Sequence, residues 1–545
     1  MAQTILRGNL SVVAFPFVSE FGGRSVVIPQ LDENYLPKAI NSTTADSDHD
    51  RGIPQITYGH NIVPAGQGYK SVAYKQVVAG IVGHTDFVQS QVVRDSLGNK
   101  AILAFTSAGG IYILSPYAVA YTPIVIAGWT YSGLVSFAFC NGQTYVCLQG
   151  KGIYLVDIVG STLTLQTMLG ITAANMVGIT DSNNYMIAFD TQVIYWSSTV
   201  NVLDFVPSLI TGAGSSTPND LNGLIVIAVG LNNGFVIYNS GCPIVASYSG
   251  NTNYPWIFRS ASFGAGLATS DQVTIGDSLG WHWAWTTAGL IKVTNSSGCD
   301  QVFPELTDFL AGKIYEDYDS PTKVMTRTYI NNNLAVRLAF IGSRYLVISY
   351  GLVDEQYTYA LVYDTGFSRW GKLKINHVNC FELGVNTTGG VLTYTGLAGN
   401  LYNAYTTTPY TLLSGISNIA AAPKNDMAFL QADGSVLLAD FNFNNYSPDA
   451  VIMLGKFQVN RNQLCTLEQF EVEGINEGDS TFDVSILSTV DGSNYLPYTI
   501  PTPTITKGRL RKFNMRVTGM NHSVVCQGTF HITSTVFTFS NQGRR

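Results

Sequence analysis

The sequence has few charged residues for its length and no long hydrophobic run. Asp, Glu, Lys and Arg make up 12% of the 545 residues, against roughly 25% in an ordinary soluble domain. Val, Ile and Leu occur in runs of about four to eight residues, far short of the roughly 20 that a membrane-spanning helix needs. The sequence therefore predicts no transmembrane helix, and it predicts a surface that other molecules cover in a larger assembly.

Paired cysteines and a secretion signal are also missing. The seven cysteines are odd in number, scattered and never in a C-x-x-C pair, which predicts reduced, mostly buried thiols in a chain made in a cytoplasm. The opening MAQTILRGNL contains no continuous hydrophobic region and no cleavage pattern. A formal net charge of −7 argues against a protein that binds nucleic acid by neutralising phosphates.

What the sequence contains is strand chemistry in a repeat. It has 30 Tyr, 27 Phe and 53 Gly, and no segment shows the 3.6-residue periodicity of a convincing helix. The repeated segments, each after a short strand and a turn, are GGIYIL (109–114), KGIYLV (151–156), QVIYWS (192–197) and GFVIYN (234–239). Tyr112, Tyr154, Tyr195 and Tyr238 are spaced 42, 41 and 43 residues apart. We expect these tyrosines at equivalent positions in successive units.

A period of about 40 residues with four short strands is typical of a β-propeller blade. Weaker copies of the repeat, which bring the expected number to between six and eight, lie at 283–293, 359–370, 392–404 and 429–441. We therefore predict an all-β fold with an N-terminal arm and strands over 1–85, a β-propeller over 86–450 and a sandwich-like C-terminal β-module over 451–545. Two stacked antiparallel sandwiches without true repeats are the alternative.

Motifs for metal ions and nucleotides are weak. Asp46, Asp48 and Asp50 alternate as calcium ligands do, but Arg51 and Thr57 stand where the calcium-loop pattern needs Gly and Glu. A solvated loop is the main expectation there, with a bound divalent ion as the alternative. PAGQGYKS (64–71) and TGAGSS (211–216) lack the glycine spacing of phosphate-binding loops and are expected to be turns.

Catalytic patterns are equally weak. The seven His do not cluster, and His282 is expected to face the opposite side of its strand from Trp281 and Trp283. STVDGSNY (488–495) superficially resembles the aspartate-containing turns of sialidase-like blades, but it occurs once, outside the repeats, and is expected to be a plain hairpin turn. We expect no enzyme, and no catalytic residue, cofactor or metal ion.

One basic run stands out near the C-terminus, KGRLRKFNMR (507–516). Its cations are the candidate contact with a partner, either DNA or an acidic protein surface. The alternative is the solvated face of a strand. The residues concerned are Lys507, Arg509, Arg511, Lys512 and Arg516.

Several longer segments follow one another in a recognisable order. They are RGIPQITYGHNIVPAGQGYKSVAY (51–74), YWSSTVNVLDFVPSLITGAGSSTPNDLNG (195–223), SGNTNYPWIF (249–258), WTTAGL (285–290), FPELTDFLAG (303–312) and RVTGMNHSVVCQGTFHITSTVFTFSNQGRR (516–545). They resemble the tail-nozzle, or packaged-DNA stabilisation, proteins of short-tailed bacteriophages. The most specific match is the pattern W-S…D-F-x-P-S…T-G-A-G-S…G within 195–223.

The resemblance implies a structural virion protein of the viral tail and offers no active site. It implies a ring, of six copies, below the portal and adaptor, which prolongs the DNA channel, retains the packaged genome and conducts it at ejection. The implied partners are further copies of the chain, head-to-tail adaptor proteins, tail fibre or needle (plug) proteins, and double-stranded DNA that passes without specific binding. Ring neighbours would also cover the surface that lacks charge.

Two alternatives from other classes stay open. A receptor- or glycan-binding tail component should form trimers or bind a sugar array, and a propeller glycoside hydrolase should cluster carboxylates in its central pore. For the nozzle we expect a neutral or acidic channel wall, because each neutralised phosphate adds affinity and slows sliding. The basic run at 507–516 is then expected at a subunit or adaptor contact, away from the bore.

Overall fold

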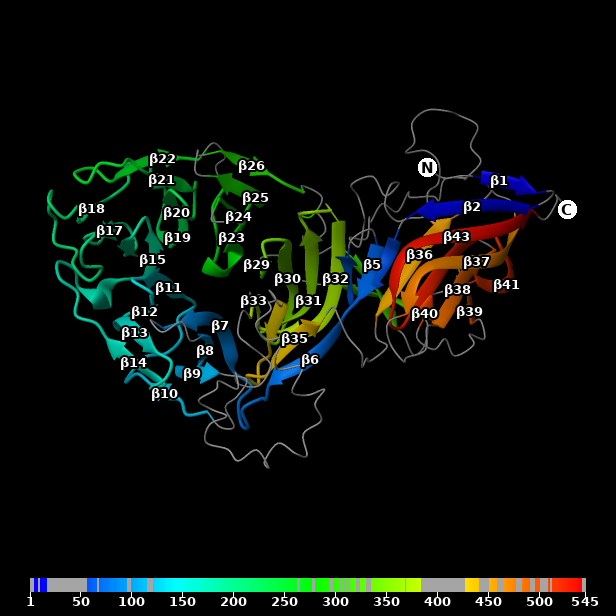
Figure 1. The fold of residues 1–545 in the computed structure, drawn as a ribbon, viewed down its shortest axis with the longest axis horizontal. Coiled ribbons are helices and arrows are strands. Elements are labelled where there is room, and N and C mark those ends of the chain that lie inside the picture. The colour runs from blue at the N-terminus through cyan, green and yellow to red at the C-terminus, as the bar shows by residue number, and fades with distance from the viewer. Residues whose placement is uncertain are drawn as a thin grey trace, which may run out of the picture.

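The protein is a β-propeller with a second β-module at its side (Figure 1). In this computed structural model the first strands of successive blades lie next to one another around a common axis, as β11 beside β15 and β33 beside β7 do. The described residues are 4–7, 10–16, 56–65, 68–95, 100–114, 121–261, 265–276, 280–294, 298–303, 306, 310, 314–319, 324–329, 335–367, 369–383, 427–440, 450–457, 464–476, 483–490, 496–499, 508–509 and 512–541.

Seven antiparallel blades, I to VII, follow in chain order, each listed from the axis outward. Blades I to III are β7 (Phe87–Arg94), β8 (Lys100–Thr106), β9 (Gly110–Leu114), β10 (Ile124–Val125); β11 (Val135–Cys140), β12 (Gln143–Leu148), β13 (Gly152–Asp157), β14 (Thr162–Leu165); and β15 (Gly178–Ser182), β16 (Tyr185–Phe189), β17 (Ile194–Trp196), β18 (Gly214–Ser216). Blades IV and V are β19 (Ile225–Leu231), β20 (Gly234–Asn239), β21 (Ile244–Tyr248), β22 (Trp256–Ser260); and β23 (Val273–Ile275), β24 (Trp281–Thr286), β25 (Gly289–Thr294), β26 (Cys299–Gln301).

Blades VI and VII are β29 (Arg337–Ile341), β30 (Tyr345–Val353), β31 (Gln356–Asp364), β32 (Arg369–His377); and β33 (Asn379–Glu382), β34 (Met427–Leu430), β35 (Val436–Asp440), β6 (Ala73–Val78). The hairpin of β27 (Ile314–Asp319) and β28 (Val324–Tyr329) lies between blades V and VI in the chain, and short 3-10 turns are η2 (Ala173–Asn175) and η3 (Ser270–Gln272). Residues with positive φ make the tight hairpins: Asn141 and Gly142 have φ of 50° and 77°, as a type I′ turn requires.

The hydrophobic core is divided among the spaces between neighbouring blades. Phe105, Val146 and Tyr154, for example, pack between blades I and II. A strand inside such a stack has a neighbouring blade on each face, so β16 is buried along its whole length. This arrangement explains why many strands read as continuous apolar runs.

A strand from the N-terminal region closes the ring of blades. β6 pairs antiparallel with β35, with Tyr74 opposite Ala439, and is the outer strand of blade VII. Blade VII is then joined to blade I through Asn379, whose Nδ2 donates to the Ser90 carbonyl at 2.7 Å. Strand pairing and side-chain hydrogen bonds therefore hold the two ends of the propeller together.

The module is built from both chain ends. One sheet, continuous with blade VI through β32 and β4, adds β4 (Ile62–Ala65), β5 (Gly68–Ser71), β43 (His531–Asn541), β2 (Leu10–Pro16), β1 (Thr4–Arg7), β37 (Cys465–Asn476), β40 (Gly508–Arg509) and β41 (Lys512–Gly519). The other contains β3 (Ile56–His60), β36 (Val451–Phe457), β42 (Asn521–Gln527), β38 (Asp483–Thr489) and β39 (Leu496–Thr499). The segment 1–85, expected as an N-terminal arm and strands, thus supplies strands to the module and to the propeller.

The predicted repeat is correct for three of the four tyrosines. Tyr112, Tyr154 and Tyr195 lie on the third strands of blades I, II and III, and each packs toward the preceding blade. The prediction for Tyr238 is wrong, because it lies on β20, the second strand of blade IV, and packs toward blade V. The connection between β17 and β18 is long. The residue 43 positions after Tyr195 therefore falls on the second strand of blade IV and not on the third.

Of the weaker copies of the repeat, two fall on equivalent hairpins and one falls on a different turn. The segments 283–293 and 429–441 include the hairpins β24–β25 and β34–β35, between the second and third strands of blades V and VII. The segment 359–370 includes the turn between the third and fourth strands of blade VI, and 392–404 lies outside the described residues.

All seven cysteines are free, six of them buried and Cys242 half-buried. Burial raises the pKa of the Cys140 and Cys147 thiols to about 12, and it also raises the pKa of Cys242. Because the thiolate is the reactive form, we expect all thiols of the native protein to react slowly with Ellman's reagent at pH 8, Cys242 first. After unfolding without reductant, mass analysis should find seven alkylated cysteines. A stable bridge would leave fewer.

Candidate functional site

A cavity of about 650 Å³ lies on the propeller axis. The first strands of all seven blades line it. Hydrogen bonds between blades show that neighbouring first strands run in the same direction. Ile179 N–H donates to Ser136 Oγ at 2.7 Å, and Phe139 N–H donates to Asp181 Oδ1 at 2.8 Å. The strands' first residues meet at one mouth, which we call the Arg337 mouth, and their last residues at the other, the Asp181 mouth.

A buried cation occupies the Arg337 mouth. Arg337 is 5% exposed, and its Nη1 donates to the carbonyls of Val88 at 3.1 Å and Val378 at 2.5 Å. Its Nη2 lies 2.6 Å from the carboxylate of Asp271, which follows Ser270 in η3. Burial alone lowers the pKa of this guanidinium, but the Asp271 charge raises it overall. Arg337 therefore stays charged and links blades I, V, VI and VII.

Neutral groups complete this mouth. The Tyr131 hydroxyl donates to Gln89 Oε1 at 3.0 Å, and Gln89 Nε2 donates to the Val135 carbonyl at 3.2 Å. Burial raises the pKa of Tyr357, beside Arg337, to about 12. The described groups at this mouth thus form a hydrogen-bonded cluster around one ion pair, in which removing either charge would leave the other buried without a partner.

The Asp181 mouth carries a different set of charges. The Arg94 guanidinium lies over the Phe139 ring, 4.3 Å from its centroid. Asp181 accepts the Phe139 N–H, and burial raises its pKa. Glu382, at the end of β33, accepts the Gly342 N–H at 2.9 Å. This mouth thus combines one exposed cation with two carboxylates.

The carboxylates that line the cavity come from blades that are not neighbours. Asp181 belongs to blade III, Asp271 precedes blade V and Glu382 belongs to blade VII. Only Asp271 is ion-paired among them in the described structure, with Arg337. A glycoside hydrolase was expected to cluster carboxylates in its central pore, and the three that line this cavity in the described structure come from alternate blades. No group of three metal-ligating side chains occurs among the described residues.

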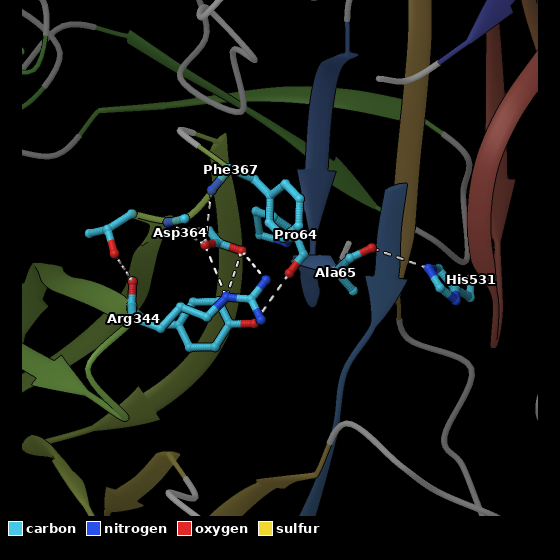
Figure 2. A network of polar contacts seen from close by, with 9 residues as sticks. Pro64, Ala65, Arg344, Asp364, Phe367 and His531 are labelled. Atoms are coloured by element: carbon cyan, nitrogen blue, oxygen red, sulfur yellow. Dashed lines mark hydrogen bonds and ion pairs between the residues drawn. The ribbon is translucent and has the colours of Figure 1, made fainter. Parts of the chain in front are cut away.

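A second polar network ties the module to blade VI (Figure 2). The Asp364 carboxylate is fully buried and accepts two bonds from Arg344 Nε, at 3.0 and 3.1 Å, and one from Nη2 at 2.6 Å. Next to it, the Tyr345 hydroxyl donates to the Pro64 carbonyl at 3.4 Å. On the other side of β4, His531 Nε2 donates to the Ala65 carbonyl at 3.3 Å. β4 thus lies between β32 of blade VI and β5, and a side chain from β43 bonds to its last residue.

The structure places the predicted basic run on the module. Lys512 and Arg516 are exposed on one face of β41, whereas Phe513 and Val517 of the same strand face the core. Lys512 lies 2.7 Å from Glu471, and because both side chains are exposed the pair adds little stability. Arg509 belongs to β40, and Lys507 and Arg511 lie outside the described residues. Neither Lys512 nor Arg516 lines the cavity.

The strand pairing shows which elements contain the other motifs. PAGQGYKS forms the β4–β5 hairpin, and STVDGSNY joins the antiparallel strands β38 and β39. TGAGSS, expected to be a turn, is one only in part, because its last three residues form β18 and pair with β17. His282 faces Tyr238 of blade IV while Trp283 packs on the opposite side, which confirms the predicted alternation. Asp46, Asp48 and Asp50 lie outside the described residues.

Sequence reasoning missed Arg337. The available signal was its isolation, since NLAVRLAFIG (333–342) contains a single charge in an apolar strand. A charge in such a strand needs a buried partner. Asp271 is 66 positions earlier in the chain, so the partner itself was not readable from the sequence.

Comparisons with known proteins give no family. No protein-family model matches the chain, and no curated protein matches it. Solved structures that match include YCF48 bound to a D1 peptide, which is 9% identical with a TM-score of 0.35 and covers 70% of this chain and 97% of its own. None of the described helical segments is long and apolar enough to cross a membrane. The propeller assignment follows from the strand order, and the function has to be argued from the chain itself.

Proposed function

We propose that the chain is the structural subunit of a phage tail nozzle. Six copies form a ring below the portal and adaptor, and the channel through the ring retains the packaged genome and conducts it at ejection. The proposed partners are the neighbouring copies, the head-to-tail adaptor proteins and a tail fibre or needle (plug) protein. The proposed role is non-enzymatic and its location is the virion.

The observation that carries this proposal is the resemblance over 195–223. These residues form β17, β18 and the connection between them, which is pinned by the Trp196 Nε1–H bond to the Gly212 carbonyl at 2.7 Å. The segment lies on the outer side of blade III, far from the axial cavity (Figure 1). Its residues therefore suit a role in shape and contact better than one in chemistry.

The geometry of the axial cavity adds support. A volume of about 650 Å³ cannot hold a DNA duplex, and the Arg337–Asp271 ion pair lies at one mouth. DNA therefore has to pass between copies of the chain, through the centre of a ring, and not through a propeller. Such a ring also covers surface that the low charge content leaves poorly solvated.

The oligomeric state of the purified full chain tests the proposal. We expect a closed ring of six identical copies by native mass spectrometry and electron microscopy, with large head-to-tail interfaces. A monomer at every concentration would contradict a nozzle, and a trimer would favour a receptor-binding tail component. For the ring itself we expect weak binding to double-stranded DNA at low salt. Tight, salt-sensitive binding would contradict a neutral or acidic channel wall.

A further inference from the structure

Blade III carries an unusual set of exposed apolar side chains. Ile210 is 93% exposed, Val200 82% and Leu209 68%, all in the connection between β17 and β18. Val206 of the same connection and Leu169 of the preceding loop are about half exposed. We call these five residues the blade III patch. Charge is scarce there, since Asp204 is the one charged residue between 197 and 213.

The patch is held in place by its backbone. Leu169 N–H donates to the Leu203 carbonyl at 2.9 Å, and Phe205 N–H donates to the Leu169 carbonyl at 2.8 Å. Phe205 and Val202 point inward and are almost fully buried in the core between blades II and III. The connection therefore has its own buried anchor, and its remaining apolar side chains point outward from an ordered framework.

The size of the patch fits the centre of a protein interface. Five aliphatic side chains at these exposures present roughly 300 to 500 Å² of apolar surface, which is as large as the largest patch on a typical monomer. One partner of a specific interface contributes about 800 Å² including its polar rim. The blade III patch would supply the apolar centre of such a contact.

A second set of exposed hydrophobic side chains lies at the other end of the molecule. Val490, Leu496 and Tyr498 are 60%, 59% and 42% exposed at the β38–β39 hairpin. β39 ends its sheet, so within the described residues one of its edges is unpaired. We call these three residues the β39 patch. Figure 1 shows blade III and the module at opposite ends of the longest axis.

We infer that the blade III patch of one copy docks on the β39 patch of the next copy. Two different patches at opposite ends cannot satisfy each other within one molecule, and their contact is head-to-tail, the type that closes into a ring through a rotation. The eight side chains of the two patches are all uncharged, so burying these side chains against one another desolvates no ion among them. This inference rests on the proposed ring and names the surfaces that hold it together.

Single-patch variants of the full chain test the contact. One variant combines Leu209→Asp and Ile210→Asp, and another carries Leu496→Asp. Because all three positions are exposed, both proteins should fold, with the circular dichroism and melting temperature of the wild type. We expect each variant alone to be monomeric at concentrations at which the wild type forms rings, with subunit affinity reduced at least 100-fold. Val82→Asp and Val159→Asp, at sites that are 100% and 73% exposed elsewhere, are the matched controls and should still form rings.

Mixing the two variants distinguishes the geometry. Each variant keeps the patch that the other lacks, so an equimolar mixture should form a one-to-one dimer and nothing larger. If both variants still form rings, or if the mixture stays monomeric, the contact is elsewhere while the proposed ring stands. If the wild type itself never assembles, the proposed function and this contact fail together.

Discussion

Replacing Arg337 by leucine is expected to lower the free energy of unfolding by about 3 to 5 kcal/mol, the usual cost of removing one partner of a buried ion pair. The substitution leaves the Val88 and Val378 carbonyls without their donor and Asp271 without its cation. Since these groups belong to or adjoin different blades, the loss falls where the propeller closes on itself. Denaturant unfolding followed by tryptophan fluorescence measures it.

Two further variants separate charge from packing. Arg337→Lys keeps a cation, but an ammonium group cannot bond to both carbonyls and Asp271 as the planar guanidinium does. We therefore expect it to lower the free energy of unfolding by less than Arg337→Leu does. The double variant Arg337→Leu with Asp271→Leu removes both charges and should be more stable than the sum of the single effects predicts. A loss below about 1 kcal/mol for Arg337→Leu would show that the cluster is not a closure element.

Acidification from pH 7 to pH 4.5 is expected to destabilise the fold strongly. Burial lowers the pKa of His282, His377 and His522 from 6.5 to about 4. Each is neutral in the native state and takes up a proton on unfolding, so its contribution is complete above pH 6.5 and is lost as the pH falls toward 4. Each histidine then contributes up to about 3 kcal/mol to the loss.

The hydrogen bonds of His282 explain why its neutral form is preferred. A carbonyl only accepts, so Nε2 carries the proton that goes to Gly230 O at 2.9 Å, and Nδ1 accepts from the Tyr238 hydroxyl at 3.0 Å. Protonation would place a second donor and a charge in a fully buried site. Asp181 acts in the opposite direction, because burial raises its pKa and the fold binds its proton more tightly.

Unfolding free energies measured between pH 7 and pH 4.5 test this expectation. The slope should correspond to an uptake of up to three protons on unfolding near pH 5. In the matched variant His282→Gln, which does not titrate, the slope should fall by about one third even if the protein is less stable at pH 7. A stability that stays level over this range would show that these histidines are protonated in the native state.

Local features of the sequence determined the blade architecture. Period-2 alternation, Asn- and Gly-containing turns and the spacing of Tyr112, Tyr154 and Tyr195 each depend on residues close together in the chain, and all were readable. The opposite facing of His282 and Trp283 is the same kind of information. The prediction for Tyr238 was wrong because the long β17–β18 connection moves the third strand of blade IV further along the chain, while the strand at Tyr238 has the same sequence pattern as the others.

The candidate site was less predictable than the blades. The repeat predicted that strands surround an axis. The sequence did not indicate which side chains lie at the two mouths of the axial cavity. Arg337 and Asp271 come from different blades, and Lys512, predicted as a partner contact, lies beside Glu471 of the neighbouring strand. Contacts of this kind depend on where strands distant in sequence are brought side by side.

By itself, the sequence determined an all-β chain of repeated four-stranded units with free cysteines and little charge. Only the tertiary structure decided that β6 closes blade VII, that strands from both chain ends share the module, and that β4 joins this module to blade VI. The reason is physical: turn chemistry and side-chain alternation act over a few residues, whereas a strand edge accepts any partner whose pattern fits. Which of several suitable strands pairs with an open edge is settled by the packing of the whole molecule.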